Sequence, residues 1–381
     1  MQEPFPLKRF DMSVSIEIIR SPRQLREFFG LAYRLYKNDP NWVAPLLGDT
    51  KKLLDPKRHP FFEHAQMTRL MARKNGRVVG RICAIDDRAH VQYWQEPVGM
   101  FGFFECENDQ DVAKTLVDSA AKWLQPRGLN YLRGPLNPST NESIGLLIEG
   151  FDSPPMFMMP YNPPYYAELL EKAGLSKIKD LYAYKLIKED ITPRLLKSAE
   201  ALRRRVKIKI RPINVKDIRA EIERVRFIYN SAWSKNWGFV PMTRAEFDYT
   251  ANDLRRILDP ALAFIAEDGN KPVGFSLALP DFNVALKRIN GRLFPFGLFK
   301  LLYYAKKIHQ ARVITTGVIE EYRGRGIDTL FYLESFERGV KAGFDWAETS
   351  WILEDNVAMN KAMEMMGGKI YKHYRIYQMP L

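Results

Sequence analysis

A turn with the features of a diphosphate-binding site lies in the second half of the chain. It reads Tyr322-Arg323-Gly324-Arg325-Gly326-Ile327-Asp328, after an apolar strand pattern and before an amphipathic helical pattern. The N-terminus of a helix attracts anions because its backbone N–H groups are unpaired and its dipole is positive there. Glycines let the backbone approach a phosphate closely, and the two arginines add positive charge. The turn matches neither GxxxxGK[ST] nor GxGxxG, so it is not one of those nucleotide-binding loops.

The turn and its flanks resemble the GNAT acyltransferase superfamily. Residues 323–328 are similar to the R/Q-x-x-G-x-G/A signature that grips the pyrophosphate of acyl-CoA, and Asn356 opens a shorter helix in the order typical of the family. The resemblance implies that acetyl-CoA or another acyl-CoA is the co-substrate. It also implies a bulge on the fourth strand, at Val318 and Ile319, whose amides hold the acyl carbonyl and pantetheine. The coenzyme would be held by Val318, Ile319, Arg323, Gly324, Arg325, Gly326, Ile327, Asp328 and Asn356.

Two residues depart from the family pattern. Asp328 stands where the signature usually ends in Gly or Ala. Its carboxylate either repels a pyrophosphate or points outward and stabilises the first helical turn. The tyrosine that many members use as the acid for the departing thiolate maps to Met363, so the resemblance assigns no acid here.

Residues 346–353 carry the candidate general base. The side chains of this strand alternate, and Glu348 lies on the less apolar face. In GNAT proteins the fourth and fifth strands splay apart beside this position, so we expect Glu348 to border the cleft and deprotonate an amine. The alternative is a solvated carboxylate at a sheet edge. Other candidates are His309, His373, Tyr371 and Tyr374.

Three longer segments are expected to surround the cleft. Trp233, Trp237 and Phe239 fall where GNAT folds shape the acceptor site, and they indicate either an apolar acceptor pocket or packing between domains. The Pro-, Met- and Tyr-rich insertion in 134–164 is expected to pack over the cleft of the second domain, and the alternative is a rigid structural loop. The aromatic and basic segment 293–312 is expected to cover the cleft or the other half, rather than to lie on a membrane surface.

Each half of the chain follows one plan, which predicts a duplicated fold. Both halves contain a strand hairpin, a long helix before a strand, and a short helix before a Tyr-rich strand. Equivalent glycines are 194, 215 and 193 residues apart: Gly80 and Gly274, Gly128 and Gly343, Gly174 and Gly367. We therefore expect an α/β protein with mixed sheets, built as two tandem GNAT-like acyl-CoA N-acyltransferase folds. A flexible lead-in spans 1–12, a degenerate domain 13–192 and an acyl-CoA-binding domain 193–381.

The first half replaces the basic glycine turn by carboxylates. Glu105, Glu107 and Asp109 stand at the equivalent place. Since three carboxylates oppose a pyrophosphate, only the second domain is expected to bind coenzyme.

Composition limits the partners and the compartment. No apolar run reaches the roughly 20 residues of a membrane span, and no signal peptide is recognised, so we expect a cytoplasmic protein. Cys83 and Cys106 have no partner at ligand spacing, which predicts neither a disulfide nor a metal site. Asn141-Glu142-Ser143 matches a glycosylation triplet, which has no meaning without secretion. The net charge of +13 favours a nucleotide-bearing cofactor, nucleic acid or an anionic surface.

The expected reaction is direct transfer of an acyl group from acyl-CoA to an amine of a small molecule or a protein. The expected acyl group is acetyl. One alternative is an acyl-CoA-binding or sensing protein without turnover, which Asp328 and Met363 favour. Another is a Fem-type aminoacyl transferase that uses charged tRNA, which the positive charge favours. The sequence leaves the acceptor and the oligomeric state open.

Overall fold

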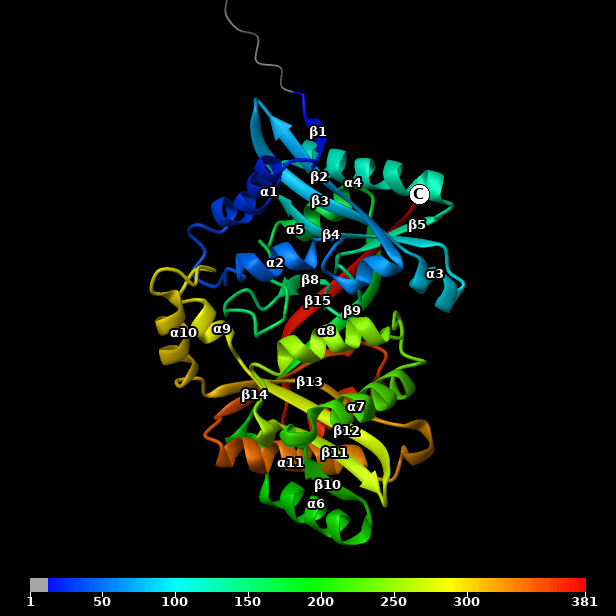
Figure 1. The fold of residues 1–381 in the computed structure, drawn as a ribbon, viewed down its shortest axis with the longest axis vertical. Coiled ribbons are helices and arrows are strands. Elements are labelled where there is room, and N and C mark those ends of the chain that lie inside the picture. The colour runs from blue at the N-terminus through cyan, green and yellow to red at the C-terminus, as the bar shows by residue number, and fades with distance from the viewer. Residues whose placement is uncertain (1–12) are drawn as a thin grey trace, which may run out of the picture.

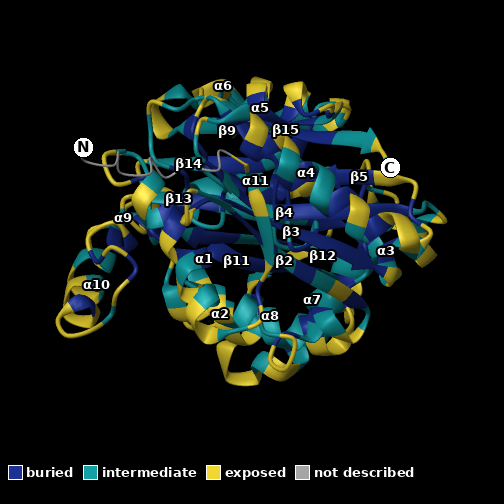
Figure 2. Ribbon diagram, turned by 90° about the horizontal axis from the view of Figure 1, so that it is seen from above, coloured by how far each residue is buried: buried dark blue, intermediate teal, exposed yellow. Residues whose placement is uncertain are grey.

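The computed structural model describes residues 13–381, so the lead-in expected over 1–12 lies outside the described residues. These residues form one continuous mixed sheet with helices on both faces (Figure 1). The strand order is β1-β2-β3-β4-β5-β15-β9-β14-β13-β12-β11-β10, and β8 (Leu146–Glu149) pairs with β15. Helices α4, α5 and α11 lie on one side of the sheet and α1, α2, α7 and α8 on the other (Figure 2).

The first half forms antiparallel strands followed by a parallel one. β5 pairs parallel with β4 after the crossover helix α4. The strands are β1 (Ser15–Ile18), β2 (Ala65–Lys74), β3 (Arg77–Asp87), β4 (Val98–Cys106) and β5 (Tyr131–Gly134). The helices are α1 (Pro22–Leu35), α2 (Leu47–Leu53), α3 (Arg88–Trp94), α4 (Gln110–Leu124) and α5 (Tyr166–Lys172). The insertion after β5 carries the small ribbon of β6 (Leu136–Asn137) and β7 (Ser143–Ile144).

The second half repeats this plan, as the sequence predicted. β14 pairs parallel with β13 after the crossover helix α11. The strands are β10 (Lys209–Pro212), β11 (Ala263–Asp268), β12 (Lys271–Pro280), β13 (Gln310–Val318) and β14 (Trp346–Leu353). The helices are α7 (Ile218–Ala232), α8 (Arg244–Leu254), α11 (Ile327–Lys341) and α12 (Val357–Met365), and α6 (Pro193–Arg205) connects the two halves.

The two halves exchange their closing strands across the domain boundary that was expected at residues 192 and 193. β15 (Lys369–Pro380) ends the second half but pairs with β5 of the first, and β9 (Ser176–Ile187) ends the first half but pairs with β14. Tyr377 is buried in the core of the first half, and Tyr184 packs beside Met363 of the second. β9 and β15 also pair antiparallel with each other, which makes the two sheets one.

The insertion between β12 and β13 contacts the first half through α9 and the residues after it, but its second helix does not cover the cleft, and that part of the expectation is wrong. Its short helix α9 (Asn283–Leu286) lies against the body of the protein, and the following Gly291 lies close to Pro45 and Tyr33. The next helix, α10 (Gly297–Ala305), projects away from the molecule (Figures 1 and 2). Phe294, at the start of this projection, is 86% exposed.

Candidate functional site

A cavity opens where β13 and β14 separate. The two strands pair from Gln310 and Trp346 as far as Val313 and Thr349, and their later residues do not pair. A cavity of about 980 Å³ lies there and reaches through the sheet. On one side it is lined by the turn before α11 and by α12, and on the other by α7, α8 and a loop of the first half. Its size is at the upper end of the usual range for ligand sites.

The predicted diphosphate turn forms one wall of this cavity. Gly324 and Gly326 have φ angles of 71° and 81°, in the left-handed region that favours glycine. Gly326 is the N-cap of α11 and no side chain caps this end, so amides of the first helical turn remain available to an anion. Arg323, Gly324, Ile327, Asp328 and Asn356 all line the cavity.

The two arginines of the turn have different surroundings. Arg323 donates from Nε to the carbonyl of Val318 at 3.2 Å and from Nη2 to the carbonyl of Ala232, so it fastens the turn to the end of α7. Arg325 is exposed, with its guanidinium 4.5 Å from the centre of the Tyr322 ring. Arg325 also donates, from Nη2 to the carbonyl of Glu321 at 3.1 Å, and both arginines are exposed, so each keeps part of its guanidinium free for a phosphate.

Asp328 lies exposed in the first turn of α11 and lines the cavity. Its carboxylate accepts a hydrogen bond from the backbone N–H of Thr329 at 2.9 Å. A carboxylate in the first turn stabilises the helix, but this one lines the cavity rather than pointing away from it, and it occupies one amide that a phosphate would otherwise meet.

The bulge of β13 lies at Ile314, so the predicted position at Val318 and Ile319 is wrong. Leu277 of β12 pairs with Thr315 and Ala278 pairs with Val313, which leaves Ile314 as the extra residue. Near the turn, β13 stays paired with β12, and the N–H of Ile319 donates to Val273 at 3.0 Å. The backbone irregularity occurs instead where β14 departs from β13.

Glu348 is fully buried, so it neither borders the cleft nor lies solvated at an edge. β9 pairs along the outer side of β14, and this makes β14 an internal strand. The Glu348 carboxylate accepts from the hydroxyls of Ser350 and Tyr371 and lies 3.7 Å from Nε of Arg312. Burial raises the pKa of Glu348 and lowers the pKa of Arg312. Arg312 and Ser350 line the cavity, with Glu348 behind them.

Glu142 is a carboxylate in the wall of the cavity that the sequence analysis did not identify as a candidate base. It comes from the loop between β6 and β7 of the first half. Burial, and then the negative charges of Glu246 and Asp253, raise the pKa of Glu142 to about 8. Nε2 of His59 lies 3.8 Å from its carboxylate. His59 accepts the N–H of Phe61 on Nδ1 at 3.3 Å, and burial lowers the pKa of His59. The neutral ring therefore presents N–H from Nε2 toward Glu142.

The Glu142 loop is fixed by hydrogen bonds to the second half. The Oγ1 of Thr140 donates to the carbonyl of Gly238 at 2.7 Å, and the Nδ2 of Asn141 donates to that of Val240 at 3.0 Å. The hydroxyl of Tyr229 donates to Oδ1 of Asn141 at 2.8 Å. The insertion thus packs over the second half, as expected from the sequence. In the sequence, this loop showed only the glycosylation triplet at residues 141–143. Its hydrogen-bond partners lie more than 80 residues away, so no local pattern revealed its role.

The aromatic loop after α7 lines the cavity and also contacts the first half. Trp233, Trp237 and Phe239 line the cavity, and the carbonyl of Phe239 accepts from the Trp94 indole of the first half at 2.7 Å. The Trp233 ring lies against Gly317 of β13, so closely that a Cβ there would be 2.2 Å from it. One wall of the cavity and the contact between the two halves are therefore the same surface.

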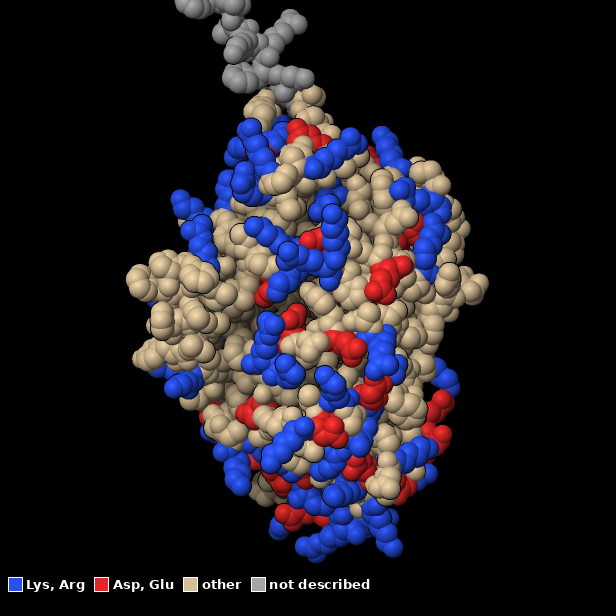
Figure 3. Space-filling model, in the orientation of Figure 1, with Lys and Arg blue, Asp and Glu red and all other residues tan. Residues whose placement is uncertain are grey.

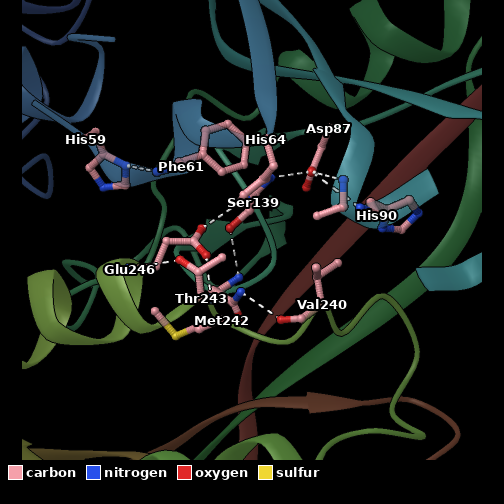
Figure 4. Close-up of polar contacts among 12 residues, drawn as sticks. His59, Phe61, His64, Asp87, His90, Ser139, Val240, Met242, Thr243 and Glu246 are labelled. Carbon is pink, nitrogen blue, oxygen red and sulfur yellow. Dashed lines mark hydrogen bonds and ion pairs between the residues drawn. The ribbon is translucent and has the colours of Figure 1, made fainter. Parts of the chain in front are cut away.

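His64 connects the two halves beside the cavity (Figure 4). Its Nδ1 lies 2.9 Å from Asp87 and its Nε2 lies 3.0 Å from Glu246 of α8. Burial alone would lower the pKa of His64, but its hydrogen bonds to both carboxylates outweigh burial and raise the pKa to about 10. His64 is therefore a cation at neutral pH. Glu246 also completes a capping box with Thr243, which fixes the start of α8.

The equivalent turn of the first half is filled by its own side chains. Asp109 caps α4 by accepting from the amides of Asp111 and Val112, and it pairs with Lys74 at 2.6 Å. Glu107 pairs with Arg77, and Glu105 accepts from the hydroxyls of Tyr36 and Tyr166. The amides that correspond to the open end of α11 are thus already bound to a carboxylate.

Within residues 13–381, no group of His, Cys, Asp and Glu side chains is arranged to hold a metal ion. In the same range, no helix has both the length and the apolar character needed to cross a bilayer.

Comparison with curated proteins gives two relatives of full or nearly full length. The chain is 36% identical over 391 residues to the bacterial ceramide synthase of Caulobacter vibrioides, covering 99% of this chain and 100% of that protein. It is 37% identical over 362 residues to protein YghO of Escherichia coli, covering 93% and 92%. No family model matches the chain.

Comparison with solved structures gives the fold. A tandem GNAT protein from the clavulanic acid biosynthesis pathway superposes with a TM-score of 0.54 at 12% identity, over 97% of this chain and 98% of that chain. The GCN5-related glucosamine N-acetyltransferase region of a fungal GH3 β-N-acetylglucosaminidase gives 0.57 at 14% identity, over 97% of this chain and 38% of that chain. The protein therefore has the tandem GNAT fold that the sequence predicted.

The His64 ion pairs predict a pH-dependent stability. The pKa of His64 is raised above its ordinary 6.5 on folding, so its stabilisation is complete below pH 6.5 and is lost as pH rises through about 10. We expect His64→Gln to lower the free energy of unfolding by roughly 1–3 kcal/mol at neutral pH. Urea unfolding at a series of pH values measures the deficit, which should shrink toward pH 10.

The matched control is His309→Gln, because His309 is exposed and should change stability little. A deficit for His64→Gln that stays constant across this pH range would contradict the electrostatic account and indicate lost packing.

Proposed function

We propose, since the chain belongs to the family of the bacterial ceramide synthase and YghO, that it joins a long-chain acyl group from acyl-CoA to the amine of a long-chain amino alcohol. A ceramide is such an amide. The observation that carries the proposal is the single cavity that links the open N-terminus of α11 with the Glu142 carboxylate. An N-acyltransferase needs both ends: an anion site for the donor and a base for the acceptor.

The donor end fits the diphosphate of coenzyme A. Glycines at positive φ and uncapped amides suit a pyrophosphate, and Arg325 adds an exposed cation. The splay between β13 and β14 leads from this turn toward the centre of the sheet, which suits the extended pantetheine arm. Asn356, the N-cap of α12, lies on the same wall. Bound acyl-CoA would supply the activated thioester, and the chain's residues would hold it in the splay.

The acceptor end favours hydrocarbon. Its walls include Ile222 and Val225 of α7, Phe247 and Leu254 of α8, and the aromatic loop with Trp233. Burying a methylene group there is worth about 0.8 kcal/mol, so such walls select long chains. The proposal therefore replaces the acetyl group of the first expectation by a longer acyl chain.

Glu142 is the proposed general base. The amine nitrogen attacks the thioester carbonyl, the C–N bond forms, and the proton of the nitrogen passes to the Glu142 carboxylate. The C–S bond then breaks and coenzyme A leaves as a thiolate that takes up a proton. A base works best when its pKa is close to the working pH, and the pKa of Glu142 is about 8. The Nε2–H of His59 would stabilise the carboxylate before it accepts the proton.

A paired-substrate assay tests the function. Purified protein is given acyl-CoA donors from acetyl to palmitoyl, each with sphinganine or with a short amino alcohol such as serinol. Release of coenzyme A and the mass of the amide product are measured. We expect release only when both substrates are present, fastest with the long donor and the long amine. Release that favours acetyl-CoA and serinol would contradict the lipid assignment, and no release with any pair would favour a non-catalytic binding protein.

Changing Glu142 tests its role as base. We expect Glu142→Gln to lower kcat/KM by roughly 100-fold or more. Wild-type kcat/KM should rise with pH through about 8 as Glu142 ionises, and the variant should lose this limb. Affinity for acyl-CoA should stay unchanged, because Glu142 lies at the acceptor end. Glu149→Gln, an exposed change close in sequence, is the control. A variant that keeps the wild-type pH limb would exclude Glu142 as the base.

Changing Asp328 tests the donor site. Asp328→Ala removes a carboxylate from the first turn of α11 and frees the Thr329 amide. We expect the dissociation constant of acyl-CoA to fall by roughly threefold to tenfold, since like-charge repulsion at a partly screened site is of the order of 1 kcal/mol. Calorimetric titration measures the change, with Glu337→Ala farther along α11 as control. Weaker binding by Asp328→Ala would mean that this carboxylate takes part in holding the coenzyme.

A further inference from the structure

The segment 283–309, here called the projection, carries an exposed apolar surface. It lies between β12 and β13 in the chain and contains α9, which packs against the body, and α10, which extends away from it (Figures 1 and 2). Its exposed large side chains are Phe294 (86%), Phe296 (69%), Leu298 (46%), Phe299 (71%), Leu302 (58%) and Tyr303 (56%). Scattered single apolar residues are common on a protein surface, but a contiguous group of this kind marks a site of interaction.

The same segment is strongly basic. Between Asp281 and Glu320 the sequence contains no acidic residue. The projection contains six cations: Lys287, Arg288, Arg292, Lys300, Lys306 and Lys307. In Figure 3 its body is tan and Lys or Arg atoms lie at its border. The ammonium of Lys307 lies 4.4 Å from the centre of the Tyr303 ring, and the guanidinium of Arg288 lies 5.3 Å from that of Tyr304, so cations flank the aromatic residues.

This combination selects one kind of partner. Aromatic and leucine side chains beside lysines are typical of segments that lie in the surface of a bilayer, with the rings among the head groups and the cations on anionic lipid. A second copy of the chain would place six cations against six, and like charges oppose such a contact. With nine residues, α10 is too short to span a bilayer, so it can lie on the surface only.

We propose that the projection docks the protein on an anionic lipid bilayer by inserting Phe296, Phe299 and Leu302 between head groups. The inference rests on exposure and charge alone and is independent of the proposed acyl transfer. The projection leads directly into β13, the strand that lines the cavity. Docking therefore holds the cavity close to the membrane surface, where amphiphilic molecules are concentrated.

Vesicle binding by the full chain tests the proposal without any substrate. The protein is sedimented with vesicles of phosphatidylcholine alone and with vesicles of phosphatidylcholine and phosphatidylglycerol in equal amounts. Two variants change the projection: Phe296→Ser/Phe299→Ser/Leu302→Ser and Lys300→Glu/Lys306→Glu/Lys307→Glu. The controls change exposed residues elsewhere: Val215→Ser/Phe227→Ser/Ile370→Ser for apolar surface, and Lys197→Glu/Arg204→Glu/Lys207→Glu for charge.

We expect wild-type protein to bind the mixed vesicles, more weakly at high salt, and to bind phosphatidylcholine poorly. Each projection variant should lose roughly tenfold or more in vesicle affinity, and the controls should lose much less. Circular dichroism checks that the variants are folded, as expected for changes at exposed positions. Vesicle binding that both projection variants retain would overturn the proposal. So would a dimer of the wild type that the serine variant dissociates, since a second copy would then cover the surface.

Discussion

The pairing of β9 with β15 is the constraint on which the rest of the structure depends. Each strand closes the sheet of the other half, so backbone hydrogen bonds run without a break from β1 to β10. A flexible linker between two GNAT-like domains would leave their relative position free. Here the exchanged strands fix it, and the loop that carries Glu142 is held over the aromatic loop after α7. The cavity therefore has walls from both halves, and neither half contains the whole site.

The same strand exchange buries the polar groups that lie where β13 and β14 separate. β14 is covered by β9 on one side, and it leaves β13 after Thr349 on the other. The Arg312–Glu348 pair is buried where these strands part, with its remaining polar atoms bound by Ser350, Tyr371 and the carbonyl of Phe157. A buried pair is tolerated only when its hydrogen bonds are satisfied. Arg312 thereby connects the strand that lines the cavity with the insertion of the first half, which gives the back wall of the cavity a fixed shape.

Local patterns in the sequence predicted local structure well and long-range structure less well. The glycines at 324 and 326, the uncapped start of α11 and the repeated strand–helix order were all readable, because backbone geometry and helix ends are set by neighbouring residues. The strand exchange could not be predicted from the sequence, because both closing strands have a similar Tyr-rich alternation. The expected position of Glu348 at the cleft was wrong for the same reason, because β9 covers β14 and buries this side chain. Glu142 was missed because its burial and its carboxylate neighbours come from residues more than 90 positions away.

Two carboxylates with raised pKa lie near the cavity, and their surroundings give them different capacities. Glu348 accepts hydrogen bonds from two hydroxyls and faces a guanidinium, so protonating it would break an existing network. Among residues 13–381, the only basic side chain within ion-pair distance of Glu142 is the neutral His59 ring, and its carboxyl lines the cavity. Burial raises both pKa values, but only Glu142 can gain and lose a proton without rearranging its neighbours. In the proposed reaction, proton transfer therefore belongs to the loop of the degenerate half, and the half that keeps the coenzyme turn supplies the donor site.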